Sequence, residues 1–231
     1  MTITFITGAN KGLGYETARR LIELGHTVLV GARDPERGAK AAAELGARFV
    51  RIDVTDDASV AAAAADVAEH EGTVDVLINN AGVAGPSGDP GELTAAQALA
   101  VFEPNLFGAI RTTTAFLPLL RRSADPVIVN VSSGLGSLAI THDPSRIESS
   151  VVAPLYTASK AALIMLTTQY AKGLKDVRVN VVDPGYTATD LNGNSGPQTV
   201  TEGTDAIVGL ATEGPGAGSG RFVDRHGEIA W

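Results

Sequence analysis

The segment Tyr156-Thr-Ala-Ser-Lys160 brings together two side chains that could move a proton. A spacing of four residues places the phenol and the ammonium on one face if the segment is helical. A cation beside a phenol favours the phenolate and lowers the pKa of the tyrosine from about 10 toward the neutral range. Such a tyrosine can give or take a proton at neutral pH. Alone, this pair is more often a packed ring beside a solvated amine, so its interpretation depends on two other segments.

The first of these is a glycine-rich segment, Thr7-Gly-Ala-Asn-Lys-Gly-Leu-Gly14, between an apolar run and a helical stretch. Glycine permits a tight turn and lets the backbone approach a pyrophosphate, which then lies at the positive N-terminus of the helix. The spacing is G-x3-G-x-G rather than the common G-x-G-x-x-G. Its position at the start of a βαβ unit predicts dinucleotide binding by Gly8, Asn10, Lys11, Gly12, Leu13 and Gly14.

The choice of cofactor depends on the end of the second apolar run, Val30-Gly-Ala-Arg33. Sites for NAD usually carry a carboxylate there for the ribose 2′-hydroxyl. Ala32 cannot fill that role, whereas Arg33 suits a 2′-phosphate and Lys11 could reach the same group. These residues predict NADPH (or NADP) over NADH. Asp34 follows directly, and a shifted register would bring its carboxylate near the ribose instead.

The second segment is the pair Ser132-Ser133, at the end of the apolar run Val127–Val131. Ligands bind at the carboxyl ends of parallel strands, where one serine hydroxyl could hold a carbonyl oxygen.

Apolar runs alternate with helical stretches along the whole chain, which predicts an α/β fold with a parallel sheet covered on both faces. We expect a Rossmann-type, doubly wound sheet of about seven strands in a single domain, residues 1–231. The expected strands are Thr2–Thr7, Thr27–Ala32, Ala47–Ile52, Val74–Asn79, Pro126–Ser132, Val177–Val182 and Arg221–Val223. The expected helices are Gly12–Leu24, Pro35–Leu45, Ala58–Glu69, Leu93–Leu120 and Leu155–Leu174.

Composition excludes several classes of function. A net charge of -8 argues against a nucleic-acid-binding face. No apolar run is long enough to span a bilayer, and the first residues lack the basic region of a signal peptide. The chain has no cysteine, and its four histidines lack metal-ligand spacing. We therefore expect a cytoplasmic, metal-independent protein.

With these segments in order, the chain resembles the short-chain dehydrogenase/reductase family over almost its whole length. Its pattern is most similar to the NADPH-dependent carbonyl reductases of that family. The motifs that carry the resemblance are Thr7-Gly8-x3-Gly12-x-Gly14, Asp53-Val54, Asn79-Asn80-Ala81-Gly82, Asn105, Ser132-Ser133, Tyr156-x3-Lys160 and Pro184-Gly185.

The resemblance implies an oxidoreductase that moves a hydride between NADP(H) and a carbonyl or alcohol substrate. It implies Asn105, Ser133, Tyr156 and Lys160 as the catalytic set, with Ser132 as the alternative serine. Asn105 would lie at a kink of the long helix and hold a water against Lys160. Beside the glycine-rich loop and Arg33, the residues it implies for cofactor binding are Asp53, Val54, Asn80, Ala81, Gly82, Tyr156, Lys160, Pro184, Gly185, Thr187 and Thr189.

Two departures from the family pattern bear on substrate and assembly. The insert between Ser133 and Tyr156 is longer than usual and resembles that of monomeric carbonyl reductases, which indicates a monomer or a homodimer. We expect its charged residues Asp143, Arg146 and Glu148 to face solvent. We expect His142 to lie in a surface loop; the alternative is that it contacts substrate. The segment Asp190–Thr201 is short, which predicts an open site.

Two other functions remain compatible with the sequence. One is an NADP-sensing binding protein with the same fold and little catalysis. The other is an epimerase or dehydratase that recycles its cofactor. The sequence does not identify the small-molecule substrate.

Overall fold

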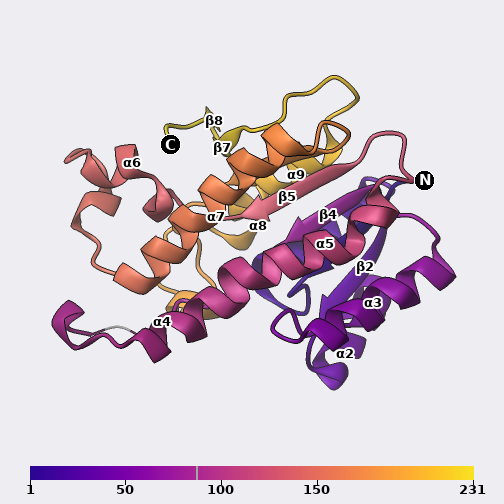
Figure 1. Cartoon of the computed structure of the whole chain (residues 1–231), viewed down its shortest axis with the longest axis horizontal. Helices are drawn as coiled ribbons and strands as arrows, with labels where there is room; N and C mark the ends of the chain where they lie inside the picture. Colours follow the sequence, from indigo (N-terminus) through magenta and orange to yellow (C-terminus); the bar gives the residue numbers. More distant parts are fainter. Residues whose placement is uncertain (87) are drawn as a thin grey trace.

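The computed structural model describes residues 1–86 and 88–231 and contains one sheet of eight strands (Figure 1). The strand order is β3-β2-β1-β4-β5-β6-β7-β8, parallel except for the antiparallel pair β7–β8. The strands are β1 (Ile3–Thr7), β2 (Thr27–Ala32), β3 (Arg48–Arg51), β4 (Val76–Asn79), β5 (Val127–Val131), β6 (Arg178–Val182), β7 (Phe222–Asp224) and β8 (Gly227–Glu228).

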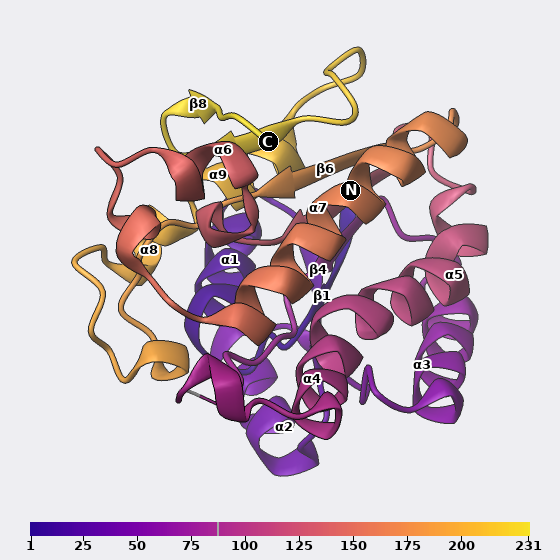
Figure 2. The ribbon, with the colours of Figure 1, turned by 60° about the vertical axis from the view of Figure 1, so that its left-hand side comes forward.

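Helices cover both faces of this sheet (Figure 2). Residues of α1 (Gly12–Glu23), α2 (Pro35–Leu45) and α9 (Asp205–Thr212) pack on one face. Residues of α3 (Asp57–His70) and α5 (Gly108–Leu120), with the C-terminal part of α7 (Pro154–Gly173), pack on the other. The remaining helices are α4 (Ala95–Phe102), α6 (Leu138–His142) and α8 (Val200–Gly203).

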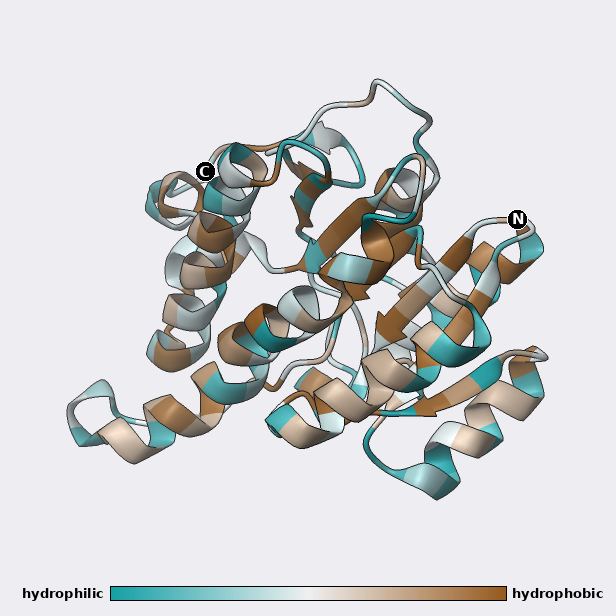
Figure 3. Cartoon of the chain, turned by 45° about the vertical axis from the view of Figure 1, so that its right-hand side comes forward, coloured by the Kyte–Doolittle hydropathy of each residue, from teal (hydrophilic) through white to brown (hydrophobic). Residues whose placement is uncertain are grey.

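Burial on both faces explains why the strands read as continuous apolar runs. All five residues of β5 are buried, and Figure 3 shows the inner strands as mostly hydrophobic. The Phe5 ring on β1 lies 4.4 Å from the Phe116 ring on α5, centroid to centroid, which fixes that helix against the sheet. The predicted doubly wound parallel sheet is therefore confirmed.

The predicted strands and helices agree with the structure in place, with small differences at their ends. The bounds of β2 and α2 are those predicted. The strand count was one too low, because the two residues of β8 pair only with β7 across a hairpin. The helices α6, α8 and α9 were also not expected. They are short, and α9 carries a helix-weakening Gly209 within its apolar run.

The predicted helix Leu93–Leu120 is interrupted where a kink was expected. It consists of α4, a π-helical turn over Glu103–Phe107 and then α5. Pro104 lies at the start of the turn and cannot donate a backbone hydrogen bond. The turn places Asn105 in the interior, where its side chain is buried.

The insert before α7 is more ordered than a surface loop and is joined to the end of the chain. It contains α6 and a 3₁₀ turn over Ile147–Ser150. The Ala139 N–H donates to the Trp231 carbonyl at 3.1 Å, and the Trp231 ring packs 5.7 Å from the Phe222 ring, centroid to centroid. Figure 2 shows the C-terminus close to α6.

In the described ranges, none of the helices is long and apolar enough to cross a bilayer. The predicted cytoplasmic location remains a prediction.

Candidate active site

The candidate residues gather at the carboxyl edge of the sheet, where β1, β4, β5 and β6 end. Strand order reverses on the two sides of β1, because β2 and β3 lie to one side and β4 to the other. In open α/β sheets the crevice at such a reversal is where ligands bind. The glycine-rich loop follows β1, Asn80–Gly82 follows β4, and Ser132-Ser133 follows β5.

Thr7 joins the glycine-rich loop to the segment after β4. Its hydroxyl accepts from the backbone N–H groups of Asn80 and Ala81, each at 3.0 Å. The Asn80 side-chain amide donates back to the Thr7 carbonyl at 2.9 Å. These bonds hold the two segments at a fixed separation beside the reversal point.

The glycine-rich loop has the close packing that dinucleotide binding requires. A Cβ at Gly14 would lie 2.5 Å from the Asn80 amide nitrogen and 2.6 Å from the Gly8 carbonyl oxygen, so only glycine fits. The helix α1 begins at Gly12, and its first turn carries no acidic residue. Its positive N-terminus therefore favours an anion such as a pyrophosphate.

Of the residues expected to select the cofactor, Arg33 and Asp34 follow β2, and Lys11 lies in the glycine-rich loop after β1. Asp53 follows β3, and its pKa is lowered. Burial acts to raise this pKa, but hydrogen bonds from Thr55 and, to a smaller extent, the charge of exposed Arg33 outweigh burial. Asp34 caps α2 by accepting from the Arg37 N–H at 3.0 Å. Its carboxylate is therefore bound to the N-terminus of the helix. Lys11 pairs with Asp190 at 3.0 Å.

Lys160 is buried in α7 and points toward the end of β5. Its Nζ donates to the Val131 carbonyl at 2.8 Å and lies 5.6 Å from the centroid of the Tyr156 ring. Burial lowers the pKa of Lys160 to about 8. The tyrosine and the lysine therefore share one face of α7, as the spacing predicts.

The expected lowering of the tyrosine pKa was wrong for the structure as it stands. The pKa of Tyr156 is raised to about 12. The largest cause is burial, and the negative charge of Asp183 adds to it, whereas a hydrogen bond with Ser133 acts in the opposite direction. Lys160 stacks near the ring and donates to a backbone carbonyl, so its charge is not directed at the phenol oxygen.

The two serines after β5 have different partners. The Ser132 hydroxyl is buried and donates to the Lys160 carbonyl at 3.0 Å, which holds α7 to the sheet. The Ser133 hydroxyl accepts from the Leu135 N–H at 3.2 Å and bonds with Tyr156. Of the two, Ser133 is the serine that shares the site with Tyr156.

Asn105 is tied into the same region by three hydrogen bonds. Its side chain accepts from the Val83 N–H at 2.8 Å and donates to the Val83 carbonyl at 2.9 Å. It also donates to the Ser159 hydroxyl at 3.0 Å, next to Lys160 in α7. A Cβ at Gly82 would lie 3.0 Å from Asn105 Oδ1 and 3.7 Å from Lys160 Nζ. Gly82 thus lies between two of the predicted catalytic residues.

The turn after β6 is held by residues that sequence reasoning missed. Asn192 donates to the Thr187 carbonyl at 2.8 Å and accepts from the Thr189 N–H at 3.2 Å. Asp183 accepts from the Gly185 N–H at 2.9 Å. An acid directly before Pro184-Gly185 was visible in the sequence, but nothing there indicates that its side chain is buried.

His142 ends α6 and is exposed, with its Nδ1 2.8 Å from the Leu138 carbonyl oxygen. Glu148, expected to face solvent, has only 16% of its side chain exposed and pairs with Arg146 at 2.9 Å. The insert therefore turns part of its charge toward the sheet.

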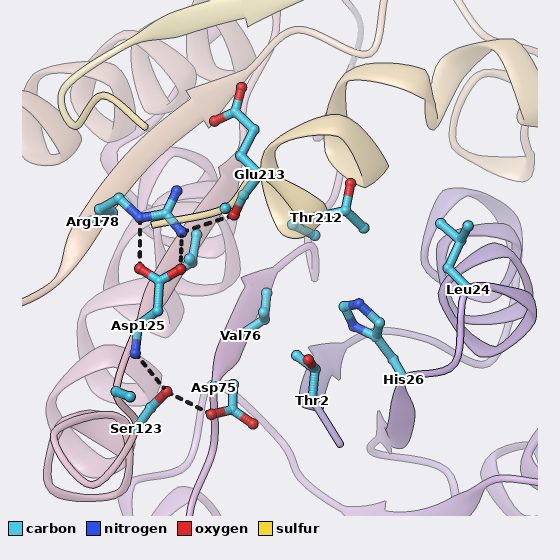
Figure 4. A pocket seen from close by; sticks show the side chains of 14 residues that line it. Thr2, Leu24, His26, Asp75, Val76, Ser123, Asp125, Arg178, Thr212 and Glu213 are labelled. Atoms are coloured by element: carbon cyan, nitrogen blue, oxygen red, sulfur yellow. Dashed lines mark hydrogen bonds and ion pairs between the residues drawn. The ribbon is translucent and has the colours of Figure 1, made fainter. Parts of the chain in front are cut away.

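A separate pocket of about 520 Å³ lies at the opposite, amino end of the sheet (Figure 4). Several of its polar side chains are engaged in structural bonds: Arg178 holds Asp125, and Asp75 accepts from Ser123 and from the Ile3 N–H. The candidate residues named above lie at the other end of the strands. Among the described residues no group of acidic, histidine or cysteine side chains could hold a metal ion.

The chain is similar to known proteins in both sequence and fold. The model of the short chain dehydrogenase family matches residues 2–199. The chain is 39% identical to the short-chain dehydrogenase anuI of Penicillium roqueforti over 246 residues, which cover 99% of this chain and 97% of the relative. It is 32% identical to (-)-isopiperitenone reductase of Mentha piperita, over 97% of this chain and 96% of that one.

Among solved structures, the fold is similar to that of the NADPH-bound carbonyl reductase from chicken fatty liver. The TM-score is 0.87 and the identity 29%, and the likeness covers 100% of both chains.

Proposed function

Because this chain belongs to the short-chain dehydrogenase family, an oxidoreductase family, we propose that it is an NADPH-dependent reductase of small carbonyl compounds. The observation that carries the proposal is the meeting of Ser133, Tyr156 and Lys160 beside the glycine-rich loop. The carbonyl reductase among the similar structures binds NADPH, which supports the same cofactor here.

The residues present fit a dinucleotide. Gly14 lets the start of α1 pack closely against Gly8 and Asn80, the N-terminus of α1 favours a pyrophosphate, and exposed Arg33 suits a 2′-phosphate. Asp53, Val54 and Asn80–Gly82 would hold the adenosine half. Pro184, Gly185, Thr187 and Thr189 would hold the nicotinamide end. When bound, the nicotinamide supplies the hydride.

The protein's own part is to orient the carbonyl and to move a proton. Ser133 and Tyr156 would donate hydrogen bonds to the carbonyl oxygen, and the Tyr156 phenol would protonate it as negative charge develops there. A pKa near 12 keeps this phenol protonated at neutral pH, as reduction requires. Lys160 would bind the cofactor ribose, and Asn105 positions the neighbouring backbone.

The test is incubation of the purified protein with NADPH and a panel of aldehydes, ketones and quinones. Stoichiometric loss of nicotinamide absorbance with product alcohol is expected. Protein that binds NADPH but oxidises it with no member of the panel would argue for the sensing function. Product formation without net cofactor oxidation would indicate an epimerase or dehydratase.

A further inference from the structure

Asp183 is a buried acid that links two turns of the candidate active site. It directly follows β6, is 5% exposed, and accepts from the Gly185 N–H at 2.9 Å. The Gly134 N–H, in the turn after Ser133, also donates to this carboxylate. A Cβ at Gly134 would lie 2.6 Å from Asp183 Oδ2, so the approach requires glycine. One carboxylate thus holds both the serine turn and the Pro184-Gly185 turn.

The same carboxylate lies within electrostatic reach of Tyr156. Burial raises the pKa of Asp183, while the two N–H donors favour its ionised form. The charged or titratable groups around the two residues come from three parts of the chain. Lys160 of α7 lies beside Tyr156. Arg146 and Glu148 of the insert and Asp224 of β7 lie around Asp183.

We propose that Asp183 is a positioning residue of the active site, which fixes the serine turn against the Pro184-Gly185 turn and places a negative charge near the Tyr156 phenol. This inference rests on the proposed function, since it requires Tyr156 to exchange the proton. The charge makes the phenolate harder to form. The negative charge therefore favours carbonyl reduction, which uses the protonated phenol. Alcohol oxidation needs the phenolate and should require a higher pH.

The decisive variant is Asp183→Asn, which keeps the shape and the acceptor for Gly185 but removes the charge. The pH profile of kcat/KM for oxidation of the product alcohol with NADP should shift to lower pH by about 0.5–1 unit, because the phenolate forms more easily. The maximal rate should also fall, since an amide nitrogen cannot accept from the Gly134 N–H. The matched control, Asp143→Asn, removes the same charge from the exposed insert and should leave the profile in place.

Two further variants separate charge from folding. Asp183→Glu keeps the charge, so its profile should stay at the wild-type pH while its maximal rate falls. Asp183→Ser removes the charge with a smaller side chain and should shift the profile as Asp183→Asn does.

An active wild type whose profile is the same in Asp183→Asn overturns the inference but leaves the proposed function intact. If Asp183→Asn and Asp183→Ser both fail to fold while Asp183→Glu folds, the carboxylate serves only folding. That result would also overturn the inference. A wild type inactive in both directions refutes the proposed function itself.

Discussion

At the scale of single residues, burial acts on Tyr156 and Lys160 in the same sense, because it disfavours the charged form of each. It raises the pKa of the phenol to about 12 and lowers that of the ammonium to about 8. Tyr156 and Lys160 were predicted as a pair from their spacing, and Ser133 and Asn105 from the resemblance to the family. The roles of Asp183 and Asn192 were not, because burial and hydrogen bonding to distant backbone depend on the folded sheet.

Replacing Tyr156 with Phe removes the proton donor and keeps the ring. Turnover should fall by about 10²-fold or more, with NADPH binding preserved. Steady-state kinetics and fluorescence titration with NADPH measure the two effects, and Tyr170→Phe in the same helix serves as control. Near-normal turnover in Tyr156→Phe would move the acid elsewhere, with His142 the first residue to examine.

Arg33→Ala tests cofactor choice. The affinity for NADPH should fall about tenfold or more, since a charge-assisted bond to phosphate is lost, whereas the affinity for NADH should change little. Lys40→Ala removes an exposed charge from α2 and should affect neither. Equal losses for the two cofactors in Arg33→Ala would place the guanidinium away from the 2′-phosphate.

Lys160→Met tests the cost of burying an ammonium. The folded pKa of about 8 lies below the ordinary 10.5, so the unfolded chain binds more protons between these values. The stability of the wild type should therefore rise with pH across this window, relative to the variant, by up to about 3 kcal/mol. Urea denaturation at pH 7 and at pH 10.5 measures the difference. A constant difference would mean that the amine titrates normally in the folded protein.

At the scale of elements, the strands and long helices were predictable because burial on both faces leaves an unmistakable alternation of apolar runs and helical stretches. The structure of the insert was less predictable from the sequence. Its short helix is held by the Trp231 carbonyl, and Glu148 of its 3₁₀ turn approaches Gly134 after β5. Both contacts join residues that are distant in sequence. The π-helical turn was expected only as a kink, since Pro104 and Asn105 indicate an interruption but not its geometry.

Asn105 should stabilise the π-helical turn through its three side-chain bonds. Asn105→Ala leaves the backbone N–H and carbonyl of Val83 without these partners and should lower the free energy of unfolding by about 2–4 kcal/mol. Urea denaturation measures this loss. Gln169→Ala, at an exposed position of α7, should cost far less. If the two variants are equally stable, the bonds of Asn105 contribute nothing net to folding.

At the scale of the whole molecule, the insert lies against the start of α7 and forms a hollow of about 370 Å³ there, lined by Leu138, Val151, Pro154 and Ala158 among others. A partner helix could not pack on those first turns without displacing it. Farther along the same helix, Met165 is 59% exposed. How far the insert shields the helix from a partner is not readable from sequence, because it depends on where the insert folds.

We therefore expect a monomer. Light scattering at micromolar concentration should give a mass near 23.7 kDa. Met165→Glu should leave that mass unchanged, as it alters only an exposed side chain. A mass near four times this value, or a smaller mass in Met165→Glu than in the wild type, would show that the face of α7 forms an interface.

Trp231 is the single tryptophan of the sequence, and its backbone carbonyl is the acceptor that ties down α6. Its indole also rests near Phe222, and 45% of the residue is exposed. The protein thus carries an intrinsic optical probe at the one place where insert, sheet and chain end meet. A red shift of its emission would report release of the insert, without any attached label and without interference from a second indole.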